Sequence, residues 1–247
     1  MRNYESEIKA RVEFIRGVLS AARAEGLVYG NSGGKDSALV GFLCKMACEN
    51  TVGLIMPCGS KRNYEADKAD AETIAGQYGI AARLIDLSGL KDELRRAVGE
   101  NTLLTEAALA NMAPRLRMTA LYAVAASENR LVAGTGNRSE RYMGYFTKWG
   151  DGAFDFNPIA DLTVTEIYEF LRFIKAPDFI INKAPSAGLF DGQTDEAEMG
   201  VTYRSIDDFL LTGLANDRDR AIIERLHKLG EHKRHNPLVY GLAYPGG

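Results

Sequence analysis

Apolar residues in the N-terminal part of the chain alternate between helical and extended spacing. Residues 4–24 repeat apolar side chains every three to four positions, which predicts an amphipathic helix that ends near Gly26. Residues 52–56 are apolar without interruption, a pattern typical of a strand buried on both faces of a parallel sheet. The predicted elements are a helix over 4–24, a strand over 27–31, a helix over 36–49, a strand over 52–56, a helix over 63–78 and a strand over 80–87.

The rest of the chain continues this alternation. Residues 103–128 form a long helical stretch that Pro114 is expected to interrupt, because proline lacks the N–H that an interior helical position donates. An apolar run from Leu131 precedes a turn and a further helix, and residues 162–173 again show helical spacing. Strands that alternate with helices predict an α/β protein whose doubly wound, mostly parallel sheet carries helices on both faces.

Composition and charge narrow the class of protein. The chain has 247 residues and no low-complexity or Pro/Gly/Ser-rich linker, so we expect a single domain over residues 1–247. A net charge of -3 lacks the basic footprint of nucleic-acid-binding proteins, so no nucleic acid is expected as a partner. The sequence has no signal-peptide pattern and no run of about 18 apolar residues, which predicts a cytoplasmic protein without a membrane partner.

A glycine-rich turn joins the predicted strand at 27–31 to the next helix. Its glycines let several backbone N–H groups point into one concavity, where they bind anionic oxygens, and the helix that follows adds its positive N-terminal end. The hydroxyl groups of Ser32 and Ser37 can donate hydrogen bonds to phosphate, and the carboxylate of Asp36 suits Mg²⁺. We therefore interpret the turn as a pyrophosphate-binding loop.

Three other motifs overlap this turn. A Walker A loop requires glycine where Tyr29 stands and a hydroxyl residue where Asp36 stands, so that interpretation fails at two positions. Residues 30–34 do satisfy G-x-S-x-G, the nucleophile elbow of serine hydrolases, and Ser32 stays open as an alternative nucleophile. A glycine-rich turn without any chemistry is the remaining alternative.

Residues 32–37, Ser-Gly-Gly-Lys-Asp-Ser, resemble the S-G-G-x-D-S signature of the N-type ATP pyrophosphatases. Members of that family cleave ATP between the α and β phosphates, and they include GMP synthetase, asparagine synthetase, tRNA-modifying enzymes and NAD synthetase. The signature therefore implies one half of the reaction and leaves the second substrate to be identified from the rest of the chain.

Further motifs resemble those of the ammonia-dependent NAD synthetases and occur in the order of that family. They are N-x-x-A-R-x-R-M-x-x-L-Y at residues 111–122, with Pro114 in place of the alanine, G-T-x-N-x-S-E at 134–140, G-Y-x-T-K-x-G-D-x-x-x-D-x-x-P at 144–158, K-x-P-S-A-x-L at 183–189, and E-H-K-R at 231–234. Because these motifs span nearly the whole chain, the resemblance implies both the fold and the second substrate, deamido-NAD.

The resemblance also implies roles for individual residues. For ATP it implies Gly30, Asn31, Ser32, Gly33, Gly34, Lys35, Asp36, Ser37, Thr135, Lys183 and Thr202. For deamido-NAD it implies Arg115, Lys148, Asp155, His232 and Lys233. Asp36 and Glu140 are the expected Mg²⁺ ligands, and the expected catalytic residues are Asp36, Lys183 and Asp151. Asp151 lies where an acidic side chain can receive a proton from ammonium, and a turn residue that bonds its own backbone is the alternative.

The implied activity is that of a ligase that converts deamido-NAD to NAD with ATP, Mg²⁺ and ammonia, through an adenylated intermediate that releases pyrophosphate and AMP. The resemblance further implies a homodimer, with the apolar stretch 103–126 at the interface, and no glutaminase domain. Residues 184–200 are expected to form a lid over ATP. Another ATP-pyrophosphatase amidotransferase, a serine hydrolase and a nucleotide-binding protein without turnover stay open as alternatives.

Overall fold

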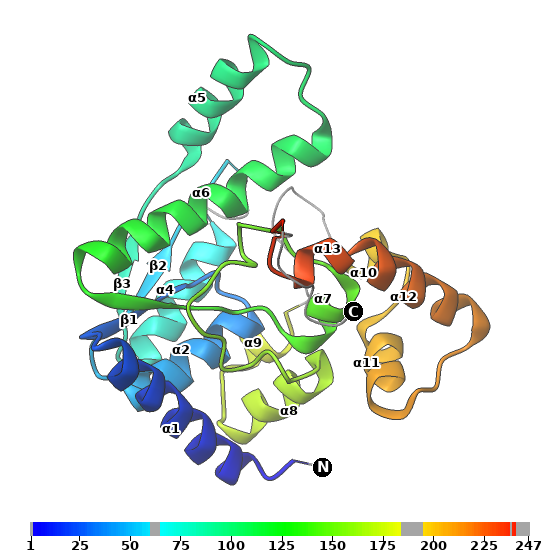
Figure 1. Cartoon of the computed structure of the whole chain (residues 1–247). Coiled ribbons are helices and arrows are strands. Elements are labelled where there is room, and N and C mark those ends of the chain that lie inside the picture. Colours follow the sequence, from blue (N-terminus) through cyan, green and yellow to red (C-terminus); the bar gives the residue numbers. More distant parts are fainter. Residues whose placement is uncertain (1, 60–64, 184–194, 238, 241–247) are drawn as a thin grey trace.

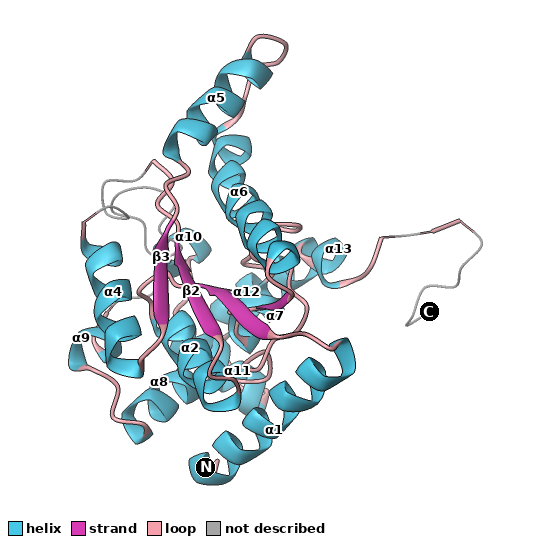
Figure 2. Cartoon of the chain, turned by 90° about the vertical axis from the view of Figure 1, so that its left-hand side faces the viewer, coloured by secondary structure: helices cyan, strands magenta, loops and turns pink. Residues whose placement is uncertain are grey.

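The computed structural model describes every residue except 1, 60–64, 184–194, 238 and 241–247. In this described part, four parallel strands form one sheet in the order β3-β2-β1-β4 (Figure 2). Their bounds are Gly26–Gly30 for β1, Thr51–Ile55 for β2, Ala81–Leu84 for β3 and Arg130–Ala133 for β4. The parallel sheet with alternating helices confirms the predicted α/β class.

Helices connect and surround these strands (Figure 1). They are α1 Tyr4–Ala22, α2 Lys35–Ala47, α4 Ala66–Tyr78, α5 Ser88–Gly99, α6 Glu106–Ser127, α7 Arg138–Met143, α8 Val164–Phe173, α9 Asp178–Ile181, α10 Asp195–Met199, α11 Tyr203–Thr212, α12 Asp217–Leu229 and α13 Glu231–Arg234. No helix in the described ranges is both long enough and apolar enough to cross a bilayer.

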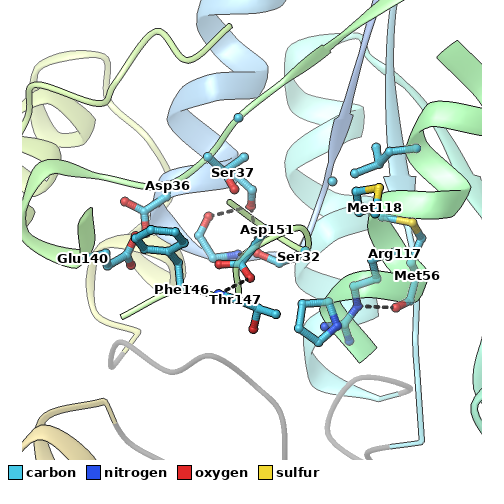
Figure 3. Close-up of a pocket in the computed structure, with 18 of the residues that line it drawn as sticks. Ser32, Asp36, Ser37, Met56, Arg117, Met118, Glu140, Phe146, Thr147 and Asp151 are labelled. Carbon is cyan, nitrogen blue, oxygen red and sulfur yellow. Dashed lines mark hydrogen bonds between the residues drawn. The ribbon is translucent and has the colours of Figure 1, made fainter. Parts of the chain in front are cut away.

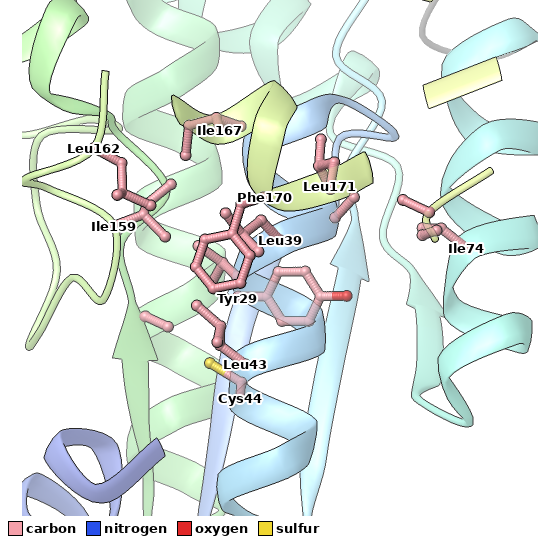
Figure 4. Packing of buried hydrophobic residues seen from close by; sticks show 14 of the residues in the cluster. Tyr29, Leu39, Leu43, Cys44, Ile74, Ile159, Leu162, Ile167, Phe170 and Leu171 are labelled. Atoms are coloured by element: carbon pink, nitrogen blue, oxygen red, sulfur yellow. The ribbon is translucent and has the colours of Figure 1, made fainter. Parts of the chain in front are cut away.

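Different helices cover the two faces of the sheet. Successive side chains of β1 point to opposite faces, so neighbouring residues of this strand pack against different helices. Leu27 and Tyr29 pack with α1, α2, α4 and α8 in one apolar cluster, part of which Figure 4 shows around Tyr29, Leu39 and Phe170. Val28 lies in a second cluster, against α6 on the opposite face. Strand β2 is buried along its full length, as its uninterrupted apolar sequence predicts.

Two predictions about the elements are wrong in detail. Pro114 does not interrupt the long helix, because α6 runs continuously from Glu106 to Ser127. The proline is buried, and it packs so closely against Gly150 that a Cβ atom on that glycine would lie 3.0 Å from the Cβ of Pro114. Packing of this kind compensates for the one backbone hydrogen bond that proline cannot donate. The strand predicted over 80–87 is also shorter, because only 81–84 pair with β2.

Helix α5 was not predicted from the sequence. It contains no buried residue, and with the first turns of α6 it projects from the rest of the molecule (Figure 1). Its ion pairs lie on the surface, for example between Arg96 and Glu93. The sequence does carry a helical signal here, because Leu90, Leu94 and Val98 recur every four positions, and this signal was overlooked.

Candidate functional site

A cavity opens at the carboxyl ends of the strands. In the order β3-β2-β1-β4, strands β2 and β4 lie on opposite sides of β1. The chain that leaves β1 therefore crosses to one side, and the chain that enters β4 arrives on the other. Loops after β1 and β4 therefore diverge at this point, where doubly wound sheets bind their ligands. The cavity has a volume of about 470 Å³ and is lined by both loops and by one face of α6.

The loop of residues 30–34 is held in the conformation that its glycines predict. Gly33 has φ +69°, and a Cβ atom there would lie 2.4 Å from the carbonyl oxygen of Asp67, so only glycine fits without displacing α4. Ser32 Oγ lies 3.1 Å from Ser37 Oγ, and the Ser37 hydroxyl donates to the carbonyl of Gly34. The N-terminus of α2 thus faces the cavity together with two hydroxyl groups (Figure 3).

All but one of the loop residues predicted to bind ATP line the cavity. The lining members are Gly30, Asn31, Ser32, Gly34, Lys35, Asp36 and Ser37. Gly33 lies behind them against α4, and the Asn31 amide is buried and donates to the carbonyl of Ala71, 2.9 Å away. Asn31 therefore fixes the loop to α4, whereas Ser32 and Ser37 present their side chains to the cavity.

Asp36 and Glu140, predicted as metal ligands, lie near each other at the cavity (Figure 3). Asn137 hydrogen-bonds both of them. Asn137 begins α7 with a capping box, in which its side chain accepts from the Glu140 N–H and its own N–H donates to Glu140 Oε2. The Asn137 amide also donates to Asp36 Oδ1 at 3.1 Å. Burial, and then the nearby charge of Asp36, raises the pKa of Glu140 to about 8.

These two carboxylates have the chemistry of a site for a hard divalent cation, because both offer oxygen ligands and both line the cavity. Within the described residues, no group of three or more His, Cys, Asp or Glu side chains is arranged to hold a metal. Two protein carboxylates do not fill the coordination sphere of a divalent cation. This fits Mg²⁺, which usually keeps water and substrate phosphates as further ligands.

Lys183, predicted to contact ATP and to act in catalysis, lies at the rim of the loop. Its ammonium group forms ion pairs with Asp67 at 2.8 Å and with Asp70 at 2.6 Å, and it donates to the carbonyl of Gly33. It also lines the cavity. The lysine thus links the glycine loop to α4, and in this structure its charge is balanced by the two carboxylates.

Asp151 faces the cavity from the loop after α7. The backbone N–H of Thr147 donates to Asp151 Oδ1 at 2.9 Å, and the Thr147 hydroxyl lies 2.6 Å from Asn111 Oδ1 on α6 (Figure 3). Asp151 is exposed to the cavity, yet the protein around it desolvates the carboxyl and raises its pKa. A carboxylate with a raised pKa is a stronger base.

The residues predicted to bind deamido-NAD lie mostly outside the main cavity. Lys233 lines it, and Lys148 and Lys233 both line an adjoining hollow of about 160 Å³. Lys148 donates to the carbonyl of His232, and Lys233 donates to the carbonyls of Gly144 and Phe146. Both lysines therefore tie the loop after α7 to the C-terminal helix α13.

Arg115, Asp155 and His232 line neither of these two cavities. Arg115 is exposed on α6 and donates to the carbonyl of Lys148, whereas Asp155 accepts from the N–H of Val132 and from the Tyr122 hydroxyl. Hydrogen bonds thus connect Arg115, Lys148 and His232 on an open surface beside the cavity.

The two predicted threonine contacts to ATP differ in their positions. Thr135 lines the cavity directly after β4. Thr202 does not line it, and its hydroxyl caps α11 by accepting from the N–H of Ser205. Residues 184–194 of the predicted lid lie outside the described residues, and 195–199 form α10.

Several residues that line or support the cavity were not predicted from the sequence. Asn137 joins the two carboxylates, and its sequence signal is the N-x-x-E spacing of a capping box. Arg117 donates to the carbonyl of Met56 at the cavity floor, and the buried carboxylate of Asp195 lines the wall and accepts from the Tyr203 hydroxyl. Arg117 and Asp195 come to the cavity only through the tertiary structure.

The hydrolase interpretation of Ser32 lacks its base. A serine nucleophile needs a histidine within hydrogen-bond reach. Among the described residues, Ser32 Oγ contacts Ser37 and Gly34, and no histidine hydrogen-bonds it. His227 instead stacks on Tyr142 and contacts its carbonyl.

Comparisons with known proteins agree with one another. The family model for NAD synthase matches residues 7–237. The NH(3)-dependent NAD(+) synthetase of Carboxydothermus hydrogenoformans is 46% identical over 242 residues, which cover 96% of this chain and 98% of that protein. The solved structure of NMN synthetase from Francisella tularensis has a TM-score of 0.92 at 35% identity, and covers 98% of this chain and 100% of that one. NH3-dependent NAD synthetase from Campylobacter jejuni has a TM-score of 0.79 at 29% identity, with coverage of 97% and 99%.

Proposed function

This chain belongs to the NAD synthase family, and we propose that it is a ligase that converts deamido-NAD to NAD with ATP and ammonia. One observation carries the proposal: the glycine loop, the N-terminus of α2 and the paired carboxylates Asp36 and Glu140 line the same cavity. That arrangement suits a nucleoside triphosphate whose α phosphorus is attacked by the second substrate.

In the first step, an oxygen of the nicotinate carboxylate attacks the α phosphorus of ATP, and the bond to the β phosphate breaks with release of pyrophosphate. Backbone N–H groups of the loop, the Ser32 and Ser37 hydroxyls and the Lys183 ammonium group stabilise the charge that develops on phosphate oxygens. Catalysis in this step is positioning and electrostatic stabilisation, without a protein nucleophile.

Asp36 and Glu140 would hold Mg²⁺, and Asn137 keeps the two carboxylates at a fixed separation. The ion would neutralise phosphate charge when it is bound. The protein contributes two carboxylate ligands and leaves the other positions to phosphate oxygens and water.

In the second step, ammonia attacks the acyl carbon of the adenylate and AMP leaves. Ammonium must first lose a proton to become ammonia. Asp151 is placed to take this proton, because its carboxyl faces the cavity and its pKa is raised. The Thr147 N–H fixes one carboxyl oxygen, so the other is available to the incoming group.

A homodimer completes the proposal. Helix α5 and the start of α6 project from the molecule and expose Leu90, Leu94 and Leu103 to solvent (Figure 1). Arg115 and His232 lie on an open surface beside the cavity. A second subunit packed on this arm would cover the apolar side chains and enclose the far half of a dinucleotide.

The direct test is to incubate the purified protein with ATP, Mg²⁺, ammonium and deamido-NAD. We expect NAD, AMP and pyrophosphate in equal amounts, and no AMP when deamido-NAD is left out. Release of AMP without NAD would refute the synthetase assignment, and labelling of Ser32 by a fluorophosphonate would favour the hydrolase.

The similarity to the NMN synthetase of Francisella tularensis supports a second candidate, amidation of nicotinate mononucleotide. The two substrates share the nicotinate, ribose and one phosphate, and they differ in the adenylate half. The ratio of kcat/KM for the two substrates decides between them. A ratio in favour of the mononucleotide would assign this chain to the second activity.

A further inference from the structure

Lys35 occupies the variable position of the S-G-G-x-D-S loop, and its side chain is buried among the carboxylates of the cavity. Only 6% of the residue is exposed, and Nζ lies 2.8 Å from Asp36 Oδ2. The ring of Tyr203 on α11 lies 5.6 Å from the same ammonium group. A buried ammonium group needs a compensating charge, and Asp36 supplies it.

Both oxygens of Asp36 already have partners. Oδ1 accepts from the Asn137 amide at 3.1 Å, and Oδ2 accepts from Lys35. The backbone N–H of Asn137 also donates to Glu140 Oε2, so Asn137 contacts both carboxylates. Each oxygen keeps a free lone pair, but a divalent cation bound to Asp36 would lie close to the Lys35 ammonium group and be repelled by its charge. The neutral amide of Asn137 exerts no such repulsion.

We propose that Lys35 is the resident counter-cation of this metal site. Its ammonium group balances the charge of Asp36 in the ligand-free protein, and it leaves Asp36 when a divalent cation binds. Lys35 therefore weakens metal binding to the free protein. ATP restores the affinity, because its phosphates bring negative charge and further oxygen ligands. The inference rests on the metal assignment within the proposed function.

The variant Lys35→Met tests this directly, because methionine keeps most of the side-chain length and removes the charge. Binding of Mn²⁺ in the absence of nucleotide, followed by electron paramagnetic resonance, should become tighter by about tenfold, since a positive charge next to the ion is lost. Lys45→Met is the matched control. Lys45 lies near the other end of α2 and pairs with Glu49, so its removal should leave Mn²⁺ binding unchanged.

Thermal unfolding supplies a second readout that does not depend on activity. Without metal, Lys35→Met should unfold at a lower temperature than the unmodified protein, because Asp36 and Glu140 then lie close together without a cation. Saturating Mg²⁺ should restore most of this loss, so the shift caused by Mg²⁺ should be larger in Lys35→Met than in the unmodified protein.

Unchanged or weaker Mn²⁺ binding by Lys35→Met would overturn the inference, as would a loss of folding that Mg²⁺ does not reverse. Weaker ATP binding together with unchanged Mn²⁺ binding would also overturn it and make Lys35 a phosphate ligand. The metal assignment fails in a distinguishable way. If neither the unmodified protein nor Lys35→Met binds Mn²⁺, or if Asp36→Asn binds it as well as the unmodified protein does, the metal site itself is rejected.

Discussion

At the scale of single residues, Asp36 and Asp151 lie in different surroundings at the same cavity, and we assign them different roles. Asp36 is held by Lys35 and Asn137 at the mouth of the phosphate-binding loop. Asp151 belongs to another loop, has no lysine bonded to it in the described structure, and has a raised pKa. Different environments give similar groups different tasks, so we assign the first to metal and phosphate and the second to ammonium.

Asp36→Ala should lower the rate of pyrophosphate release by at least about a hundredfold, because charge stabilisation at the α phosphate is lost. The variant should also be less stable, because the buried Lys35 ammonium group loses its partner, so thermal unfolding is measured beside activity. Glu140→Gln should cost less, about tenfold, since the metal keeps phosphate and water ligands. Pyrophosphate release is the measurement, and Asp208→Ala on the exposed side of α11 is the control. Normal activity of Asp36→Ala would contradict the loop assignment.

Thr147→Val should impair amide formation more than adenylation. Valine has the shape of threonine but lacks the hydroxyl that bonds Asn111, so the Asp151 loop loses one anchor on α6, worth about 1 kcal/mol. We expect less NAD per AMP released, because water then competes with ammonia for the adenylate. Thr147→Ser should restore the ratio. An unchanged NAD to AMP ratio in Thr147→Val would contradict this role.

The raised pKa of Asp151 predicts opposite effects on stability and activity. Above the folded-state pKa the carboxylate is charged at a free-energy cost, and this cost disappears as pH falls below it. Asp151→Asn should therefore raise the melting temperature at pH 7 by about 2–4 °C for each kcal/mol recovered, and the difference should vanish in acid. Amide formation in the unmodified protein should decline as pH falls through the same pKa. A lower melting temperature for Asp151→Asn at pH 7 would show that the carboxylate is not destabilising.

At the scale of elements, helix starts position the chemistry, and α7 is the clearest case. Asn137 both caps α7 and holds Asp36, so Asn137→Ala should cost about 1–2 kcal/mol of stability and should also reduce adenylation. Asn216→Ala removes the equivalent cap of α12, away from the cavity, and should reduce stability alone. Denaturant unfolding and pyrophosphate release measure the two effects. Equal activity in both variants would remove Asn137 from the site.

The sequence predicted the elements whose signals are local, and it missed those set by tertiary contacts. The buried strand at 52–56 and the glycine loop follow from apolar runs and from backbone freedom. The continuity of α6 through Pro114 depends on packing against Gly150, which no local pattern reveals. Asp36 and Glu140 were predicted through family motifs, whereas the ion pair of Lys35 with Asp36 and the role of Asn137 emerged only from the folded geometry.

At the scale of the whole molecule, the projecting arm of α5 and α6 predicts a dimer. Leu103 is 95% exposed, and Leu90 and Leu94 continue the same arm. Sedimentation at micromolar concentration should give the mass of two chains. Replacing Leu94 and Leu103 with glutamate should shift the protein toward monomer and raise the KM for deamido-NAD more than that for ATP. A fully active monomer would contradict the interface.

The central claim is that an oxygen of the nicotinate carboxylate attacks the α phosphorus of ATP, and isotope transfer tests it most directly. The enzyme is given deamido-NAD labelled with ¹⁸O in that carboxylate, together with ATP, Mg²⁺ and ammonium, and the products are analysed by mass spectrometry. The account predicts one labelled oxygen in each AMP and none in pyrophosphate. Unlabelled AMP, or label in inorganic phosphate, would contradict an adenylated intermediate.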